Sequence, residues 1–370
     1  MTTSLSEPER TVRDAAASIA SSVLQHQASV FEGRGEIDPD VFRHLGERGL
    51  MAVNVPRDCG GSEMGVRAYC HAMIEIGAAC AATAVSMAVT NMVGEVIARF
   101  GSSDQRARYC PRLAAGALGA FALSEVSAGS DPSAMQTRAD RGAHGWLLQG
   151  SKQWITHGDT AEVLVVWART GAPGTKGLSC FLVERGAPGL SVLKNEQKMG
   201  LRASHTVSLT FDEVHVPDEA LLGGLGSGFS VAMMALDGGR IGIASQAIGI
   251  ARGAQTLIKT MLRQQDVPQG VACRIADNEC SLEAATLLAL RAAALKEEGA
   301  PHTKEASMAK LYASESAFLV CNRCLEIASL MNLDSEDFAR RVRDVRVTRI
   351  YEGTSEIQRL VLGRAVISEV

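Results

Sequence analysis

The sequence predicts a mostly helical α+β fold, because a helical pattern gives way to strand-like runs and then returns. Residues 1–119 are expected to form an N-terminal helical domain, residues 120–225 a small antiparallel β domain, and residues 226–370 a C-terminal four-helix bundle. A chain of 370 residues is too long for one compact domain, which agrees with two or three packed units. Since strands and helices do not alternate, a doubly wound nucleotide-binding fold is not expected.

In the first region, apolar residues recur at helical spacing, as in the stretches 12–19 and 41–45. Pro56 and the pair Gly60–Gly61 interrupt this pattern. In the middle region, runs rich in β-branched and aromatic residues alternate with Gly, Pro and Asp, which is typical of a small antiparallel sheet. These runs are 145–148, 163–167, 178–183 and 207–211.

The last region contains long segments of alanine and leucine at 281–295 and 304–330, which predict bundle helices. Cys321 and Cys324 fall inside the second of these segments. Because no strand pattern accompanies them, we interpret both as core residues of a helix and not as a redox or metal motif.

Composition excludes several classes of function. Hydrophobic residues make up 46% and charged residues 21%, so the chain can bury a large core. The net charge of -4 gives no indication of nucleic acid or an anionic membrane as a partner. The cysteines and histidines do not cluster at metal-binding spacing, so no metal site is expected.

Two segments bear on where the protein resides. The start of the chain, residues 1–7, has neither a basic region nor an apolar core, so a cytoplasmic location is expected. The stretch from Ile76 to Gly94 carries no charge and could be mistaken for a membrane span. Because it is mostly alanine with interspersed polar residues, we expect a buried helix or two short helices.

The first candidate site segment is 121–131, which combines small residues and hydroxyl groups in a turn-rich stretch. Such a stretch can bring backbone N–H groups close to a phosphate or a flavin ring, but it equally fits an ordinary loop that enters a strand. Its candidate residues are Phe121, Leu123, Ser124, Gly129 and Ser130.

The second segment contains Trp154, Ile155 and Thr156 near the end of a predicted strand. A Trp followed by a Thr can cover an aromatic ring system and donate one hydroxyl group to it. By themselves, these residues favour a Trp that fills the protein core over one that covers a ligand.

The third segment places Asp237 and Arg240 three residues apart on one helix face. The arginine could serve a charged ligand, or the two residues could form a solvated ion pair, which is the commoner case.

The fourth segment runs from Tyr351 through Glu352, Gly353 and Thr354 to Glu356. Gly353 interrupts the helical pattern, and Thr354 can cap a new helix. A Glu just before such a break can project into a cleft, although an isolated Glu at a helix end is more often a surface residue.

Together the four segments resemble the acyl-CoA dehydrogenase family, from about residue 4 to the C-terminus. The resemblance implies that Phe121, Leu123, Ser124, Gly129, Ser130, Trp154, Ile155, Thr156, Thr354 and Glu356 bind FAD. It implies that Ser130, Asp237, Arg240, Tyr351 and Gly353 contact the acyl-CoA, and that Glu352 is the base that removes the α-proton. Some members carry the base one residue before the arginine of the third segment, but Gly239 stands there.

The implied reaction is FAD-dependent conversion of an acyl-CoA to a trans-2-enoyl-CoA, with electrons passed to an electron-transfer flavoprotein. Burial should raise the pKa of Glu352 and make it a stronger base. A homodimer or homotetramer is expected. Two alternatives stay open: a non-catalytic or half-catalytic subunit of a heteromeric complex, and an oxidase of the same fold.

Two segments depart from the family pattern. Members usually carry an Arg-x-x-Phe-Gly motif after the third segment, but Gln265 stands where its arginine should align. Members also carry paired glycines further on, where this chain has Ser329 and Leu330. In the family both motifs reach the ADP half of FAD in a neighbouring subunit. Either FAD is held weakly, or other residues substitute, or a second subunit supplies the contacts.

Overall fold

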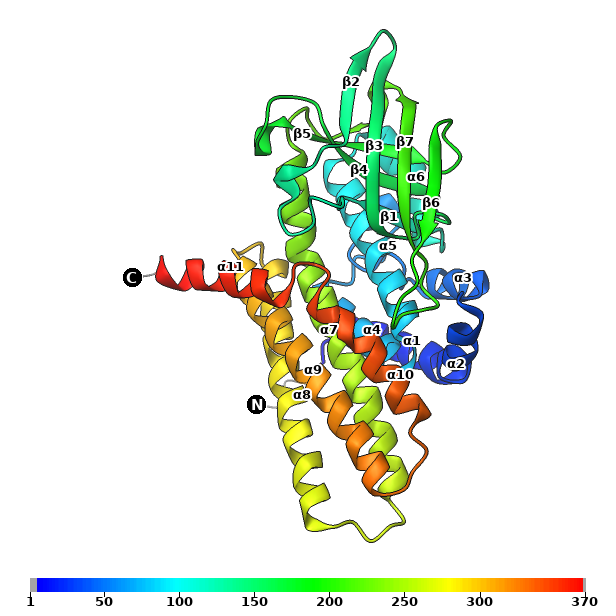
Figure 1. Cartoon of the computed structure of the whole chain (residues 1–370), viewed down its shortest axis with the longest axis vertical. Coiled ribbons are helices and arrows are strands. Elements are labelled where there is room, and N and C mark those ends of the chain that lie inside the picture. Colours follow the sequence, from blue (N-terminus) through cyan, green and yellow to red (C-terminus); the bar gives the residue numbers. More distant parts are fainter. Residues whose placement is uncertain (1–4, 369–370) are drawn as a thin grey trace.

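The computed structural model describes residues 5–368 and consists of helices, a sheet and helices in that order (Figure 1). The sheet lies at one end of the molecule, and the long C-terminal helices extend from it to the other end. The predicted mostly helical α+β class is therefore confirmed.

The N-terminal helices begin at residues that satisfy their free N–H groups. Ser6 caps α1 and Ser102 caps α6, each in a reciprocal capping box with the residue three positions later. A π-helical turn at Ala20–Leu24 joins the first two helices. The helices are α1 (Glu7–Ile19), α2 (Gln25–Arg34), α3 (Pro39–Glu47), α4 (Val66–Ala79), α5 (Ala81–Phe100) and α6 (Ser103–Ala114).

The uncharged stretch that begins at Ile76 spans two helices, because α4 ends at Ala79 and α5 starts at Ala81. Helix α5 is long and apolar enough to cross a membrane by length and composition alone. However, 83% of its most apolar window is buried inside the molecule. Its apolar character is therefore explained by packing in the protein core.

The sheet has eight strands and is mixed, not wholly antiparallel as predicted. β1 runs parallel to β4, and β2 meets β4 in a short parallel pairing, whereas the remaining pairs are antiparallel. Strand direction depends on where the chain enters the sheet, which short apolar runs do not reveal. The strands are β1 (Gly119–Ala122), β2 (Arg138–Gly142), β3 (Gly145–Thr156), β4 (Val163–Arg169), β5 (Leu178–Glu184), β6 (Leu190–Asn195), β7 (Thr206–Val216) and β8 (Leu221–Leu222).

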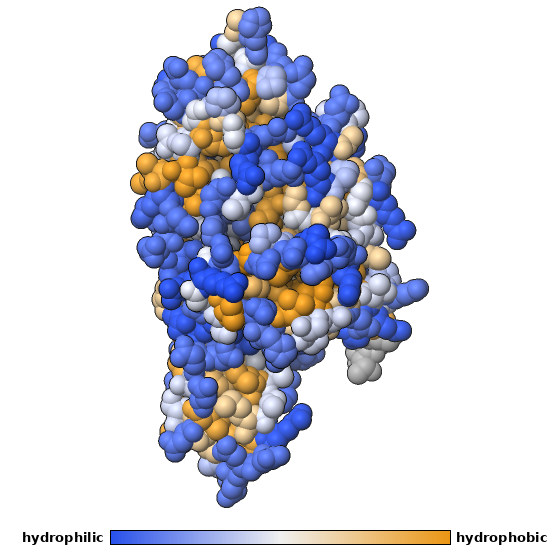
Figure 2. Space-filling model, turned by 90° about the vertical axis from the view of Figure 1, so that its right-hand side faces the viewer, coloured by the Kyte–Doolittle hydropathy of each residue, from blue (hydrophilic) through white to orange (hydrophobic). Residues whose placement is uncertain are grey.

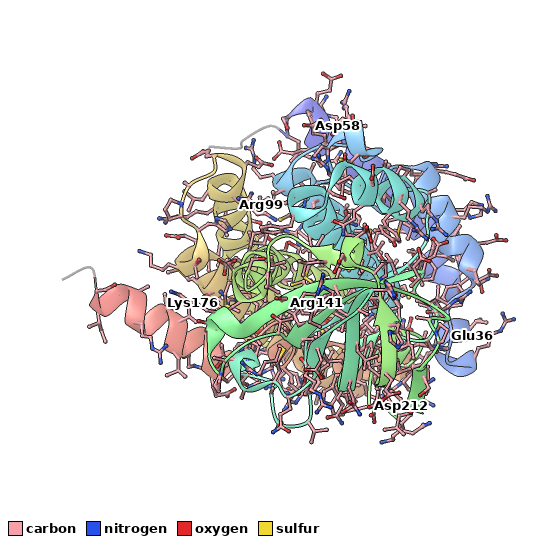
Figure 3. All side chains as sticks on the ribbon, turned by 90° about the horizontal axis from the view of Figure 1, so that it is seen from above. Glu36, Asp58, Arg99, Arg141, Lys176 and Asp212 are labelled. Atoms are coloured by element: carbon pink, nitrogen blue, oxygen red, sulfur yellow. The ribbon has the colours of Figure 1, made fainter. Side chains whose placement is uncertain are left out.

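Three long C-terminal helices lie side by side, and the shorter α10 packs against two of them as the fourth helix. Helix α11 projects from the body of the molecule, as the view from above shows, while Glu36 and Asp212 lie at the periphery of the other parts (Figure 3). Cys321 and Cys324 are fully buried on α9, as predicted. The helices are α7 (Gly228–Leu262), α8 (Gln269–Glu297), α9 (Thr303–Leu330), α10 (Glu336–Val345) and α11 (Ser355–Ile367).

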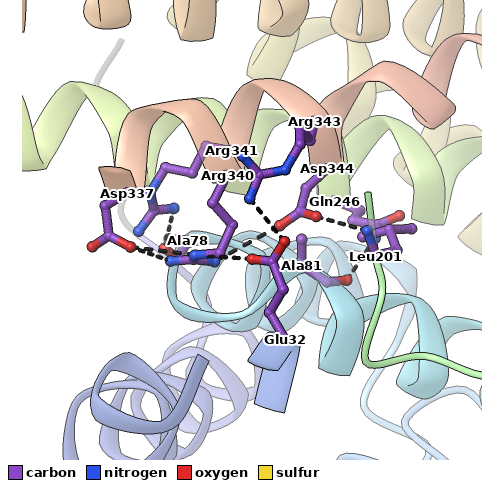
Figure 4. Close-up of polar contacts among 10 residues, drawn as sticks. All are labelled: Glu32, Ala78, Ala81, Leu201, Gln246, Asp337, Arg340, Arg341, Arg343 and Asp344. Carbon is purple, nitrogen blue, oxygen red and sulfur yellow. Dashed lines mark hydrogen bonds and ion pairs between the residues drawn. The ribbon is translucent and has the colours of Figure 1, made fainter. Parts of the chain in front are cut away.

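Charged side chains of α10 connect the three parts of the chain (Figure 4). Arg343 donates to Glu32 of α2 at 2.8 Å, and Arg341 donates to a backbone carbonyl of α4 at 2.7 Å. Asp344 accepts from the backbone N–H of Leu201 at 2.7 Å, and burial raises the pKa of this carboxyl group to about 6. These contacts fix the loop before β7 against the helices, and that loop lines the candidate site.

Candidate active site

A cavity of about 1190 Å³ lies where the N-terminal helices, the sheet and the C-terminal helices meet. Its wall is formed by α4, α5, the loop after β1, the end of β3, the loop before β7, the first half of α7, the end of α10, the turn before α11 and α11 itself. All four segments singled out in the sequence contribute to it. The predicted residues on its wall are Phe121, Leu123, Ser124, Gly129, Ser130, Trp154, Thr156, Arg240, Tyr351, Glu352, Gly353 and Thr354.

Three predicted residues do not line this cavity. The side chain of Ile155 is 1% exposed and packs in the core of the sheet. Asp237 bonds to Arg240 and to Thr303, and Glu356 is exposed in the first turn of α11. Direct contact of these three side chains with a ligand in the cavity is therefore not supported.

Glu352 stands in a turn whose backbone aims its carboxyl group into the cavity. Its φ is 53° and that of Gly353 is 88°, so both residues adopt the left-handed conformation that a non-glycine residue seldom takes. Thr354 then caps α11 by accepting from the backbone N–H of Ile357 at 3.3 Å. An uncommon backbone conformation at a cavity wall is typical of a functional residue.

Burial raises the pKa of Glu352 to about 7, while the positive charges of Arg240 and Lys310 oppose that rise. Its Oε2 atom is buried and has no hydrogen-bond partner. A desolvated carboxylate with a pKa near neutrality is a suitable general base. Gly239 faces this carboxyl group from α7, and a Cβ atom there would overlap Oε2.

Arg240 and Asp237 form an ion pair, as the sequence allowed, but the pair is not solvated. The side chain of Arg240 is 7% exposed, and its Nη1 donates to Asp237 at 2.6 Å and to Ser307 at 3.4 Å. Its Nε has no partner. The guanidinium group is thus held at the cavity wall with donor capacity left for a ligand.

The loop after β1 is held by a buried ion pair. Lys152 of β3 donates to Glu125 at 2.8 Å and to the carbonyl oxygen of Leu123 at 3.1 Å. Glu125 also accepts from two backbone N–H groups, those of Gln136 and Thr137, at 2.6 and 3.0 Å. The charge of Lys152 and these hydrogen bonds outweigh burial and lower the pKa of Glu125. Both members of the ion pair therefore also bond to the backbone, which fixes the loop against β3.

Trp154 is exposed, whereas its sequence context alone favours a tryptophan in the protein core. It is 57% exposed, has a φ of 62° and lies where the pairing of β3 with β7 shifts register. Because side chains alternate across a strand, Trp154 and Thr156 lie on the cavity side while Ile155 enters the sheet core. An exposed indole at a cavity wall is available to cover a planar ligand.

Sequence reasoning missed three residues that shape the site. Lys310 of α9 is fully buried and donates to the carbonyl oxygen of Gly353 at 2.7 Å. Buried Gln246 accepts the hydroxyl hydrogen of the predicted residue Tyr351 at 2.5 Å, and Tyr69 of α4 lines the cavity. A signal existed for Lys310 alone, because it lies on the same helix face as a row of buried alanines at 306, 309, 313 and 317.

The residues present fit a flavin dinucleotide together with a thioester. The cavity is large, Trp154 presents its ring there, and a Cβ atom on Gly129 would meet no atom within 4 Å, so a ligand can approach the loop backbone closely. A partnerless buried carboxyl group completes the wall. The fold and site thus define a protein of the flavin-dependent oxidoreductase class.

Comparison with known proteins identifies the particular family. The models of the N-terminal, middle and C-terminal domains of acyl-CoA dehydrogenase match residues 6–117, 120–214 and 226–367. The chain therefore belongs to the acyl-CoA dehydrogenase family. It is 43% identical to the mitochondrial short-chain specific acyl-CoA dehydrogenase of Bos taurus, over 87% of this chain and 81% of the relative.

Solved structures agree with this assignment. Butyryl-CoA dehydrogenase from Megasphaera elsdenii is 34% identical with a TM-score of 0.95, covering 99% of this chain and 100% of that one. A chain from work on the electron transferring flavoprotein of Acidaminococcus fermentans is 35% identical with a TM-score of 0.96 and the same coverage. A glutaryl-CoA dehydrogenase from Mycobacterium smegmatis in complex with FADH2 is 27% identical with a TM-score of 0.92, covering 98% of this chain and 95% of that one.

Proposed function

We propose that this protein dehydrogenates a short-chain acyl-CoA to the trans-2-enoyl-CoA, with Glu352 as the base. The observation that carries the proposal is the carboxyl group of Glu352, which is buried, lacks a partner at Oε2 and lines a cavity of about 1190 Å³. The short-chain preference is supported by the similarity to short-chain and butyryl-CoA enzymes.

The residues of the chain divide the chemistry into separate tasks. Glu352 takes the α-proton onto its carboxylate, which becomes neutral and thereby loses the desolvation penalty of a buried charge. FAD, when bound, supplies the acceptor for the β-hydrogen and its electron pair. Ser124, Trp154 and Thr156 would hold the flavin, and Arg240 would bind the CoA portion.

The electron acceptor is proposed to be an electron-transfer flavoprotein, on the basis of the similarity to the chain studied with the Acidaminococcus fermentans protein. A homo-oligomer is also proposed, because α8, α9, α11 and the turn before α11 carry exposed large apolar side chains. These are Leu287, Leu319, Leu330, Ile350, Leu360, Val366 and Ile367. Figure 2 shows another face, where hydrophilic residues predominate and hydrophobic residues form separate areas.

The test is anaerobic titration of the purified protein with butyryl-CoA while the visible flavin absorbance is recorded. We expect the flavin to bleach, and we expect kcat/KM with an artificial acceptor to fall as the acyl chain lengthens. A protein that binds FAD and butyryl-CoA but does not bleach would contradict dehydrogenation and favour a non-catalytic subunit. Oxygen consumption without an added acceptor would favour an oxidase.

A further inference from the structure

Lys310 is a buried cation next to the proposed base. It lies on α9 among the buried alanines at 306, 309 and 313, and its side chain is inaccessible to solvent. Burial lowers the pKa of Lys310 to about 8, although the nearby carboxyl group of Glu352 opposes this change. A lysine is seldom fully buried, because taking an ammonium group out of water is unfavourable unless a specific partner compensates.

The partner of Lys310 is the turn that carries Glu352. Its Nζ donates to the carbonyl oxygen of Gly353 at 2.7 Å. From the other side, Gln358 of α11 donates to the carbonyl oxygens of Glu352 and Gly353, both at 3.0 Å. These bonds hold both carbonyl groups toward α9 and α11 in the left-handed conformation, so that the carboxyl side chain of Glu352 is left on the cavity side.

The charge environment of the turn comes from several elements. Arg240 of α7 and Lys310 of α9 are the cations that lower the pKa of Glu352 against burial. The negative charges of Glu315 of α9 and Glu356 of α11 oppose the lowering of the pKa of Lys310. The charge of Glu352 also raises the pKa of Tyr69 of α4. Lys310 combines a hydrogen bond to the turn with a positive charge near the base, whereas Arg240 bonds to Asp237 and Ser307.

We propose that Lys310 is a positioning residue for the base: it fixes the Glu352–Gly353 turn and stabilises the carboxylate form of Glu352 from behind. This inference rests on the proposed function in one respect, that Glu352 removes the α-proton. Removal of the cation should leave Glu352 protonated up to a higher pH, since an opposite charge at close range favours the ionised form. The base would then be active only in more alkaline solution.

The test compares K310M, K310Q and K152M with wild type. For each variant we would measure flavin content, melting temperature, KM for butyryl-CoA, and the pH dependence of kcat with an artificial acceptor. In K310M we expect kcat at pH 7 to fall at least about tenfold, with KM little changed. We also expect the acid limb of the pH profile of kcat, where activity rises as the base ionises, to move up by about one pH unit. K310Q should show the same shift with a smaller loss, because an amide can still donate to Gly353.

K152M is the matched control, because Lys152 is also fully buried and its pKa is also lowered to about 8, but it bonds to the loop after β1. It should lower flavin content and melting temperature without moving the acid limb. A wild-type acid limb and kcat in flavin-loaded K310M or K310Q would overturn the proposal. If E352Q remains active, the assignment of the base fails instead, which is a separate result.

Discussion

Gly239 of α7 faces the carboxyl group of Glu352 so closely that a Cβ atom at position 239 would overlap Oε2. Position 239 is also where the family resemblance places the base in other members. The two positions therefore approach one space from opposite walls of the cavity, and this chain has room for one carboxyl group there. Glycine at 239 thus leaves the space that the Glu352 carboxyl group occupies.

The first prediction concerns G239A. The added methyl group must displace the Glu352 carboxyl group, because the nearest neighbours of a Cβ atom at 239 are Oε2, Cδ and the sulfur of Met92. We expect flavin reduction by butyryl-CoA to slow at least about tenfold in a stopped-flow measurement, since small misplacement of a reacting group is costly. G238A is the control, because its Cβ would meet the flexible end of Lys296 and should have a smaller effect. Equal rates for G239A and wild type would contradict this packing argument.

The second prediction concerns E352Q. The amide keeps the size of the side chain and cannot accept a proton, so we expect flavin reduction to fall by orders of magnitude while flavin content and thioester binding remain. The readouts are single-turnover bleaching and the spectral change on adding crotonyl-CoA. Wild-type-like bleaching by the amide variant would remove Glu352 from the role of base.

The third prediction is a pH-dependent gain of stability in the same variant. The pKa of Glu352 is raised in the folded protein from 4.5 to about 7, so its neutral form stabilises the fold below pH 4.5 and that stability is lost as pH rises through 7. Between pH 4.5 and a pH well above 7, the free energy of unfolding therefore falls by about 3 kcal/mol. E352Q avoids it, so its melting temperature should exceed that of wild type at pH 8 and approach it near pH 5. A difference that does not change with pH would show that Glu352 is not desolvated.

The four segments that line the cavity could be found in the sequence because each has a local signature. These are a break in helical periodicity at Gly353, a Trp near a strand end, a turn-rich loop, and an Asp and an Arg three residues apart on a helix. Contacts made by residues far apart in sequence had no such signature. Lys310 meets Gly353 across 43 positions and Lys152 meets Glu125 across 27. The mixed direction of the strands also depended on long-range pairing. The side chain of Ile155 lies away from the cavity for a simpler reason, since strand alternation sends it into the core.

The fourth prediction concerns R240A. Arg240 should contribute to binding of the CoA portion, because it lines the cavity and its buried Nε has no partner, and its charge also lowers the pKa of Glu352. At high pH we expect the increase in KM for butyryl-CoA to exceed the decrease in kcat. At pH 7 we expect kcat to decrease further, because more of the base is protonated without the charge of Arg240. R252A on the same helix is the control, since Arg252 bonds to Thr286 and does not line the cavity. Unchanged KM and pH dependence would leave Arg240 with a structural role only.

The final prediction concerns FAD affinity. Gln265 and Leu330 stand where the family carries an arginine and a glycine that contact the cofactor of a neighbouring subunit. Both are exposed, Gln265 in the connection between α7 and α8 and Leu330 at the end of α9. A glutamine cannot offer a fixed charge to a pyrophosphate. A leucine places a side chain where a glycine would let the backbone approach the cofactor.

We therefore expect the purified protein to be partly free of flavin. Added FAD should raise its melting temperature in a concentration-dependent way, because a ligand that binds only the folded form stabilises it by mass action. Dialysis followed by measurement of flavin per chain provides the check. Stoichiometric flavin after extensive dialysis would show that other residues replace the lost contacts. Loose flavin that becomes tight only when a related subunit is co-expressed would instead indicate that the complete cofactor site is built from two different chains.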